Sequence, residues 1–289
     1  MNILENENLI VESKNFGAEI TRIFSKKANK EILWNGDSKF WGRHSPILFP
    51  LVGRLKDNET LIENDLYHMS QHGFARDMFF DILNSTQDSI TYKLSSNKDS
   101  KKLYPYSFEL LIKYTLKNAS LEVEWTVINA DDKSIFFSIG AHPAFNLNFN
   151  ECNSISDYVI EFKHRDNVSK ISLDGPYSSK VNDIGNINNL SLNNELFIND
   201  ALIYTNIDEI SLKSSKSNEC VTVKFKDFPL VGIWTPYYKD TKTTAPFICI
   251  EPWYGLADNI NSNKEFKNKE FINILNPKEK FCTIYSIEI

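Results

Sequence analysis

Two side chains suited to proton transfer, His142 and Glu251, each border an apolar segment. His142 lies in GAHPAFNL, where Pro143 requires a turn or a sheet edge. A histidine at a strand end suits acid–base chemistry near neutral pH, although a hydrogen-bonded structural histidine is the commoner role. Glu251 closes the apolar run Phe247–Ile250 and precedes Pro252. We expect Glu251 at the end of a buried strand, where desolvation would raise its pKa.

Three further segments place polar side chains among apolar ones. Arg54 follows the apolar run of SPILFPLVGRL, and His72 and Arg76 flank a glycine in QHGFARD. Asp200 stands before a strand in FINDALI, a common position for turn chemistry. Taken singly, these residues are as consistent with surface and turn roles as with ligand binding.

A metal site at His68 and His72 is disfavoured. The two histidines are four residues apart, but Met69 replaces the glutamate of the helical zinc motif. The segment is expected to be extended, which would separate the rings by about 13 Å. We therefore predict no metal ligands and no cofactor.

Several other catalytic classes lack their sequence motifs. The chain has no glycine-rich nucleotide loop and no G-x-S-x-G nucleophile motif. A glycosidase needs two nearby carboxylates; Glu251 and Asp200 are candidates, but spacing alone does not bring them together. The four cysteines form no C-x-x-C pair and are expected to be reduced; they are Cys152, Cys220, Cys249 and Cys282.

Period-two alternation dominates the segments that must position these side chains. In Ser107–Lys117 and Ser120–Asn129, apolar and polar residues alternate as in half-buried strands, and Asn118-Ala119 between them predicts a hairpin turn. Cys220–Lys226 and Phe281–Ile289 alternate in the same way. Further strands are expected at Leu9–Ser13, Ala18–Ser25, Ser89–Leu94, Ile135–Ile139, Tyr158–Phe162, Ala201–Thr205, Leu230–Trp234 and Phe247–Ile250.

This succession of short strands predicts an all-β fold, a large antiparallel β-sandwich. Helical periodicity is nearly absent. The Asn-rich stretch Val181–Asn194 is interpreted as a loop. Because no break in composition divides the chain, we expect one domain over residues 1–289.

The composition limits the classes of partner that the protein is expected to bind. The 289 residues carry a net charge of −6 and no basic stripe, which disfavours nucleic acid. No apolar stretch is long enough to span a membrane, and the N-terminus has no signal-peptide pattern. We expect a cytoplasmic protein, and aromatic residues at 13% fit apolar or sugar-facing pockets.

Taken together, these motifs resemble the aldose 1-epimerase, or galactose mutarotase, family, in particular its divergent LacX-like bacterial branch. The likeness follows the family's order over the whole chain: VGR, QHGFAR, HPAFNL, NDALI and EPWYGLADN. It implies a single large β-sandwich that binds a small sugar and converts one anomer into the other without a metal or cofactor.

The resemblance also implies roles for individual residues. His142 matches the family's general acid, and Glu251 matches its general base. His72 matches a histidine that contacts the sugar near its ring oxygen. Arg54 and Asp200 match residues that bind sugar hydroxyls.

The chain departs from galactose mutarotases next to both proposed catalytic residues. Ala141 and Ala144 replace Asn and Tyr around the histidine, and Pro252-Trp253 replaces Thr-Gln after the glutamate. The acid–base pair is kept, so the departures concern which sugar is bound. Trp253 and Tyr254 are expected to stack on an apolar sugar face.

Two other functions stay open. A hexose-6-phosphate epimerase would need a cationic clamp, for which Arg43, Lys56 and Arg76 are the candidates. A non-catalytic carbohydrate-binding or regulatory protein could use the same fold. A matched acid and base argue against that second alternative. The sequence does not indicate the oligomeric state.

Overall fold

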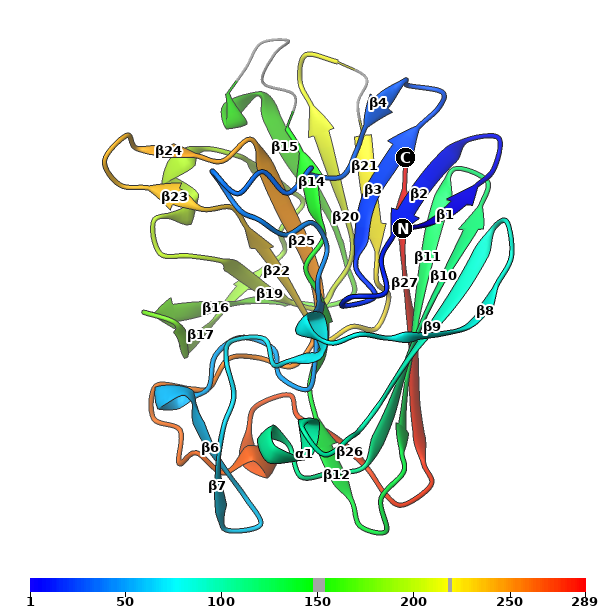
Figure 1. The fold of residues 1–289 in the computed structure, drawn as a ribbon. Coiled ribbons are helices and arrows are strands. Elements are labelled where there is room, and N and C mark those ends of the chain that lie inside the picture. The colour runs from blue at the N-terminus through cyan, green and yellow to red at the C-terminus, as the bar shows by residue number, and fades with distance from the viewer. Residues whose placement is uncertain (148–153, 218–219) are drawn as a thin grey trace.

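Two large antiparallel sheets form the framework of the chain (Figure 1). The structure is a computed structural model that describes residues 1–147, 154–217 and 220–289. The nine-stranded sheet runs in the order β18 (Asn189–Ser191), β15 (Tyr158–His164), β20 (Ile207–Ser214), β21 (Cys220–Lys224), β27 (Lys280–Glu288), β11 (Ser120–Asn129), β10 (Phe108–Lys117), β9 (Ser89–Ser95) and β8 (Asp81–Ser85).

The second sheet carries the site. Its order is β17 (Tyr177–Gly185), β16 (Val168–Asp174), β19 (Leu202–Thr205), β22 (Leu230–Trp234), β25 (Phe247–Tyr254), β13 (Ile139–Ala141) and β5 (Ile47–Leu48), with β14 (Ala144–Asn146) also paired to β25.

Alternating burial packs the two sheets against each other. The hairpin β10–β11 is confirmed, with Lys117 opposite Ser120 and Asn118 in the left-handed region at φ 53°. Every second residue of both strands is buried in the main apolar core, which also receives side chains from the second sheet. The all-β sandwich that the alternation predicted is therefore confirmed.

Smaller elements surround the sandwich. A four-stranded sheet contains β1 (Asn2–Glu5), β2 (Leu9–Ser13), β3 (Ile20–Ser25) and β4 (Lys30–Glu31). Three two-stranded pairs are β6 (Glu59–Ile62) with β7 (Asp65–His68), β12 (Ile135–Phe137) with β26 (Asn273–Leu275), and β23 (Tyr237–Tyr238) with β24 (Thr243–Thr244).

Helices in the described residues are short. They are α1 (Ser100–Leu103) and the 3₁₀ turns η1 (Lys56–Asn58), η2 (Ala75–Asp77), η3 (Ile155–Asp157), η4 (Asn194–Phe197) and η5 (Phe266–Asn268). None of these helices has the length and apolar character needed to cross a membrane.

Two expectations about elements were wrong. Val181–Asn194 is not a continuous loop, because it contains the end of β17, all of β18 and the start of η4. Its strands lie at sheet edges with mostly exposed side chains, so no alternation marks them. Ile135–Ile139 is two strands, β12 and β13, which pair in different sheets.

Candidate active site

Glu251 is carried by β25, which presents alternate side chains to opposite sides of its sheet. Ile248 and Ile250 enter the core between the sheets. The opposite side, here called the site face, carries Phe247, Cys249, Glu251 and Trp253. Apolar clusters around Trp253 and around Phe247 and Cys249 flank the carboxylate, which is 1% exposed.

Glu251 lies within the strand and not at its end as expected. Pro252 continues β25 and is the register partner of Val231 in β22. On the other side of β25 the Ile250 amide donates to the Pro143 carbonyl, 3.3 Å away. Alternate amides of a strand point to the same side, so the Pro252 nitrogen faces the break between β13 and β14. No ladder hydrogen bond is lost there, which is why the strand tolerates proline.

His142 occupies that break and reaches Glu251 from the neighbouring strand. Its Nε2 is 3.4 Å from Glu251 Oε2, and the side chains are 9% and 2% exposed. The Trp41 ring stacks on the imidazole at 4.8 Å between centroids and 25° between planes. The structure thus brings the two side chains together.

Burial makes the uncharged forms of the pair the stable ones. Desolvation, together with the charges of Arg76 and Arg43, lowers the pKa of His142 from 6.5 to about 3. Desolvation and the charge of Asp200 raise the pKa of Glu251 well above its ordinary value. The expectation for Glu251 was correct in direction. The pKa of His142, in contrast, lies below the near-neutral range that suits a histidine in acid–base chemistry.

His72 is fixed by Gly53. The His72 amide donates to the Gly53 carbonyl at 2.8 Å, and the Gly53 amide donates to His72 Nδ1 at 3.2 Å. The other ring nitrogen, Nε2, lies 3.2 Å from the Gln71 side-chain nitrogen. The rings of His72 and His142 meet edge to face at 5.5 Å, so both histidines belong to one site. Burial and nearby positive charges lower the pKa of His72 well below 6.5.

Gln71 connects two arginines to this histidine. Arg54 Nη2 donates to the Gln71 side-chain oxygen at 3.0 Å, and Arg76 Nη2 donates to its carbonyl at 2.6 Å. The Nε of each arginine is buried without a hydrogen-bond partner among the described residues. Desolvation and Arg43 lower the pKa of Arg76 to about 10. Both guanidinium groups therefore keep donors available beside His72.

Asp200 approaches the site from the turn before β19. Its backbone is left-handed, with φ 72°, and its side chain is exposed. Its charge helps to raise the pKa of Glu251, and the charge of Arg54 acts on Asp200 in turn. Asp200 therefore lies within range of the charges of Glu251 and Arg54.

Trp253 lies flat across the sheet next to Glu251. A Cβ at Gly232 in β22 would approach its ring to 2.4 Å, and one at Gly140 in β13 to 2.6 Å. Only 5% of Trp253 is exposed, so little of the ring is available to stack on a sugar. Tyr254 points to the opposite face, packing on Phe228, and its expected stacking on a sugar was wrong.

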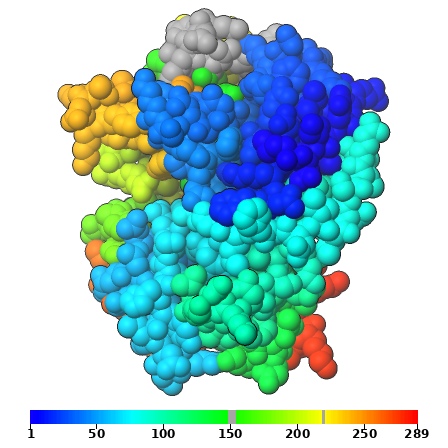
Figure 2. Space-filling view, viewed as in Figure 1, coloured from blue at the N-terminus to red at the C-terminus, as the bar shows by residue number. Residues whose placement is uncertain are grey.

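The sequence interpretation missed three site residues: Trp41, Trp234 and Cys249. Both tryptophans contact the His142 ring, with the Trp234 ring at 5.5 Å. Trp41 is held over the site because Trp34 Nε1 donates to its carbonyl at 2.9 Å. Phe40 beside it lies 6.3 Å from Tyr238, and Figure 2 shows this blue segment next to the orange β23–β24 pair. Cys249, two residues before Glu251, was predictable from strand alternation alone.

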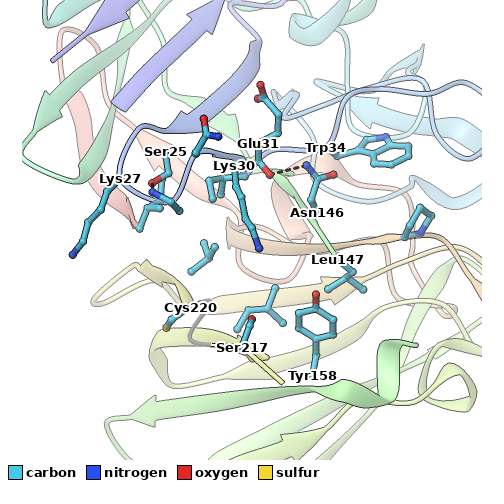
Figure 3. Close-up of a pocket in the computed structure, with 17 residues that line it drawn as sticks. Ser25, Lys27, Lys30, Glu31, Trp34, Asn146, Leu147, Tyr158, Ser217 and Cys220 are labelled. Carbon is cyan, nitrogen blue, oxygen red and sulfur yellow. Dashed lines mark hydrogen bonds between the residues drawn. The ribbon is translucent and has the colours of Figure 1, made fainter. Parts of the chain in front are cut away.

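A separate cavity of 940 Å³ lies between β3–β4 and strands β15, β20 and β21 of the nine-stranded sheet (Figure 3). Its lining includes Lys27, Lys30, Asn146, Tyr158 and Leu212, and none of the predicted site residues.

His68 ends β7 and is exposed, whereas His72 is buried at the site. This difference in burial does not favour a metal site shared by His68 and His72. Cys152 lies outside the described residues.

Comparison with known proteins agrees with this fold. The chain belongs to the aldose 1-epimerase family, whose model matches residues 2–271. The plasmid-encoded protein LacX of Lactococcus lactis subsp. lactis is 30% identical and covers 99% of this chain and 98% of its own length.

Two solved structures are similar along their whole lengths. A galactose mutarotase related enzyme from Lactobacillus acidophilus has a TM-score of 0.94 and 34% identity, covering 99% of this chain and 96% of its own. A galactose mutarotase-like protein from Lactobacillus casei has a TM-score of 0.92 and 31% identity, covering 100% and 99%.

Proposed function

We propose that this protein is an isomerase that interconverts the α and β anomers of a free aldose. The observation that supports the proposal is the buried pair His142 and Glu251, 3.4 Å apart on the site face and flanked by groups able to bind hydroxyls. Family membership supports the same chemistry. A protein that only binds sugar has no need of two proton-transferring groups in contact.

Anomer exchange requires ring opening, rotation about a carbon–carbon bond and closure on the other face. Glu251, ionised, takes the proton of the anomeric hydroxyl while His142, protonated, donates to the ring oxygen. The aldehyde forms as the ring C–O bond breaks, and the reverse transfers close the ring. The two roles are those implied by the family resemblance.

The pair needs only one proton in total to do this. The neutral pair of the ligand-free site and the ion pair required for ring opening contain the same number of protons. Moving the proton from Glu251 to His142 across 3.4 Å interconverts them. Hydrogen bonds from the sugar to the carboxylate would favour the ionised form.

The other polar groups would hold the sugar. His72, whose ring meets that of His142, would lie beside the sugar, and the unpaired Arg54 Nε–H can bind a non-reacting hydroxyl. Asp200 would accept hydrogen bonds from hydroxyls across the ring. Trp253, nearly buried, acts on Glu251, because its indole N–H favours the ionised carboxylate.

Polarimetry on freshly dissolved aldoses tests the proposal. A panel of hexoses and pentoses should contain at least one whose approach to anomeric equilibrium is accelerated in proportion to enzyme concentration. Sugar binding with only the spontaneous rate would instead identify a non-catalytic carbohydrate-binding protein.

One observation favours a second candidate, a 1-epimerase of hexose 6-phosphates. The charges of Arg43, Arg54 and Arg76 all act on His72. Asp77 is a counter-ion for two of them, 2.9 Å from Arg43 and 3.7 Å from Arg76. Lys56, the other candidate, has its amide bonded to Asp258. The same polarimetric panel with 6-phosphates decides, because a more than tenfold preference in kcat/KM for the phosphate would replace the free-sugar assignment.

A further inference from the structure

Cys249 adds a third metal-ligating side chain to the acid–base pair. One ligand atom each of His142, Cys249 and Glu251 lie within 4.8 Å of one another, and all three residues are buried. Cys249 and Glu251 share the site face because they are two residues apart in β25. The proposed epimerase chemistry uses no thiol, so Cys249 has no assigned role.

A free coordination position is a second, independent observation. Glu251 Oε2 is buried without a hydrogen-bond partner among the described residues. An unpaired carboxylate oxygen of a residue only 1% exposed is costly, and a cation would satisfy it. The oxygen lies 3.4 Å from His142 Nε2, and the cation would lie between the two atoms.

We propose that His142 Nε2, Cys249 Sγ and Glu251 Oε2 form a three-ligand site for Zn²⁺, and that Zn²⁺ bound there inhibits the protein. Tetrahedral zinc with ordinary Zn–N and Zn–O bonds separates those two atoms by about 3.4 Å. The nitrogen and oxygen already have this separation, so only the thiol must move closer.

The donor set selects the cation. Imidazole with thiolate suits zinc and its neighbours, whereas magnesium and calcium prefer oxygen ligands. On coordination the Cys249 thiol and the protonated Glu251 carboxyl each lose a proton to solvent, and the Zn–S and Zn–O bonds form in their place. Burial and the charge of Glu251 raise the pKa of the Cys249 thiol, so the free thiol is protonated and unreactive. Three protein ligands leave a fourth position for water or a sugar oxygen.

Inhibition follows because the metal occupies both proton-transferring atoms. This part of the inference rests on the proposed function, whereas metal binding does not. The two are therefore measured separately, first by a spectroscopic signal and then by rate.

Cobalt binding tests the site directly. A variant carrying Cys152→Ser, Cys220→Ser and Cys282→Ser keeps Cys249 as its only thiol. Titrating it with Co²⁺ should produce a thiolate-to-cobalt charge-transfer band that saturates at one metal per chain and is displaced by Zn²⁺. Adding Cys249→Ser to that variant should abolish the band, and Glu251→Gln, nearly isosteric, should weaken cobalt binding at least tenfold.

Absence of the band from the Cys249-only variant, with its melting temperature unchanged from wild type, would overturn the metal site. So would a band that survives Cys249→Ser. If a sugar substrate is found, Zn²⁺ should inhibit its turnover reversibly by a chelator, and Cys249→Ser should need at least ten times more Zn²⁺. Activation by Zn²⁺ would overturn the inhibitory role while leaving the binding result intact.

Discussion

At the scale of single residues, the site depends on where one proton resides. His142 and Glu251 are both buried, and desolvation acts in opposite directions on their pKa values. It lowers the pKa of the His142 imidazole and raises the pKa of the Glu251 carboxyl. The pair therefore titrates as a unit, and its pKa values belong to both members.

The pH dependence follows with a definite sign. Between the pKa of His142, about 3, and the raised pKa of Glu251, the pair keeps one proton. We expect kcat/KM for the aldose found by polarimetry to stay level as pH falls through 6.5, where an ordinary histidine would gain a proton. Activity should decline at alkaline pH, when Glu251 loses its proton and His142 stays neutral. An acid limb centred near 6.5 would contradict the buried, neutral histidine.

The two histidines should differ in their sensitivity to substitution. In our account His142 transfers a proton, whereas His72 contacts the sugar without transferring one. Asparagine keeps a donor but carries no exchangeable proton at neutral pH. His142→Asn should lower kcat by about 10²–10⁴-fold, and His72→Asn should lower it clearly less. Equal losses in steady-state assays would leave the general acid unassigned.

At the scale of elements, a buried ion pair holds the Arg54 segment in place. Asp258 contacts Lys269 through one carboxylate oxygen, and both side chains are 2% exposed. The other oxygen accepts the Lys56 amide at 2.8 Å, and the Asp258 amide donates to the Arg54 carbonyl at 2.9 Å. One carboxylate thus joins the segment after β25 to the loop that carries Arg54.

Breaking this pair should affect stability and binding together. Asp258→Asn leaves Lys269 charged and buried, which costs about 3–5 kcal/mol, measurable by urea unfolding. KM should rise because Arg54 loses its support. The double variant Asp258→Asn with Lys269→Met, which removes both charges, should recover part of the stability. A single variant as stable as wild type would show that the pair does not hold the loop.

Arg54 and Asp200 reach the site from different loops and should contribute mainly to binding. Arg54→Ala and Asp200→Ala each remove hydrogen bonds to non-reacting hydroxyls, present in both ground and transition state. We expect KM to rise more than kcat falls. A large loss of kcat at unchanged KM in either variant would mean that its role is catalytic and not one of binding.

At the scale of the whole molecule, local patterns predicted the fold better than the site. The hairpin β10–β11 was readable because both strands alternate and only two residues join them. β25 was predicted four residues too short, because its run is buried on both sides and Pro252 looked like a strand end. Pro252 fits within the strand only because the neighbouring pairing segment, distant in sequence, is interrupted between β13 and β14. Trp41 was not predictable either, since its contact with His142 joins segments a hundred residues apart.

Resemblance to a family gave the site residues, which periodicity could not. Nothing in the spacing of His72, His142 and Glu251 indicates that their side chains meet. Three separate loops and strands bring them together, and only the folded sheets define that contact. Strand alternation did predict one feature that the sequence interpretation did not use: Cys249 and Glu251 lie on the same face of their strand.

The most direct test of the central claim is the Glu251→Gln variant, with turnover and melting temperature measured on one purified sample. Glutamine matches the size of the carboxyl but cannot accept the proton, so kcat should fall by about 10²-fold or more. The raised pKa of Glu251 stabilises the fold at low pH, and this contribution is lost as pH rises above 4.5 towards the folded-state pKa. Glutamine does not titrate, so at neutral pH the variant should melt no lower than wild type. Nearly unchanged turnover with a lowered melting temperature would contradict the account, because Glu251 would then be a structural carboxylate.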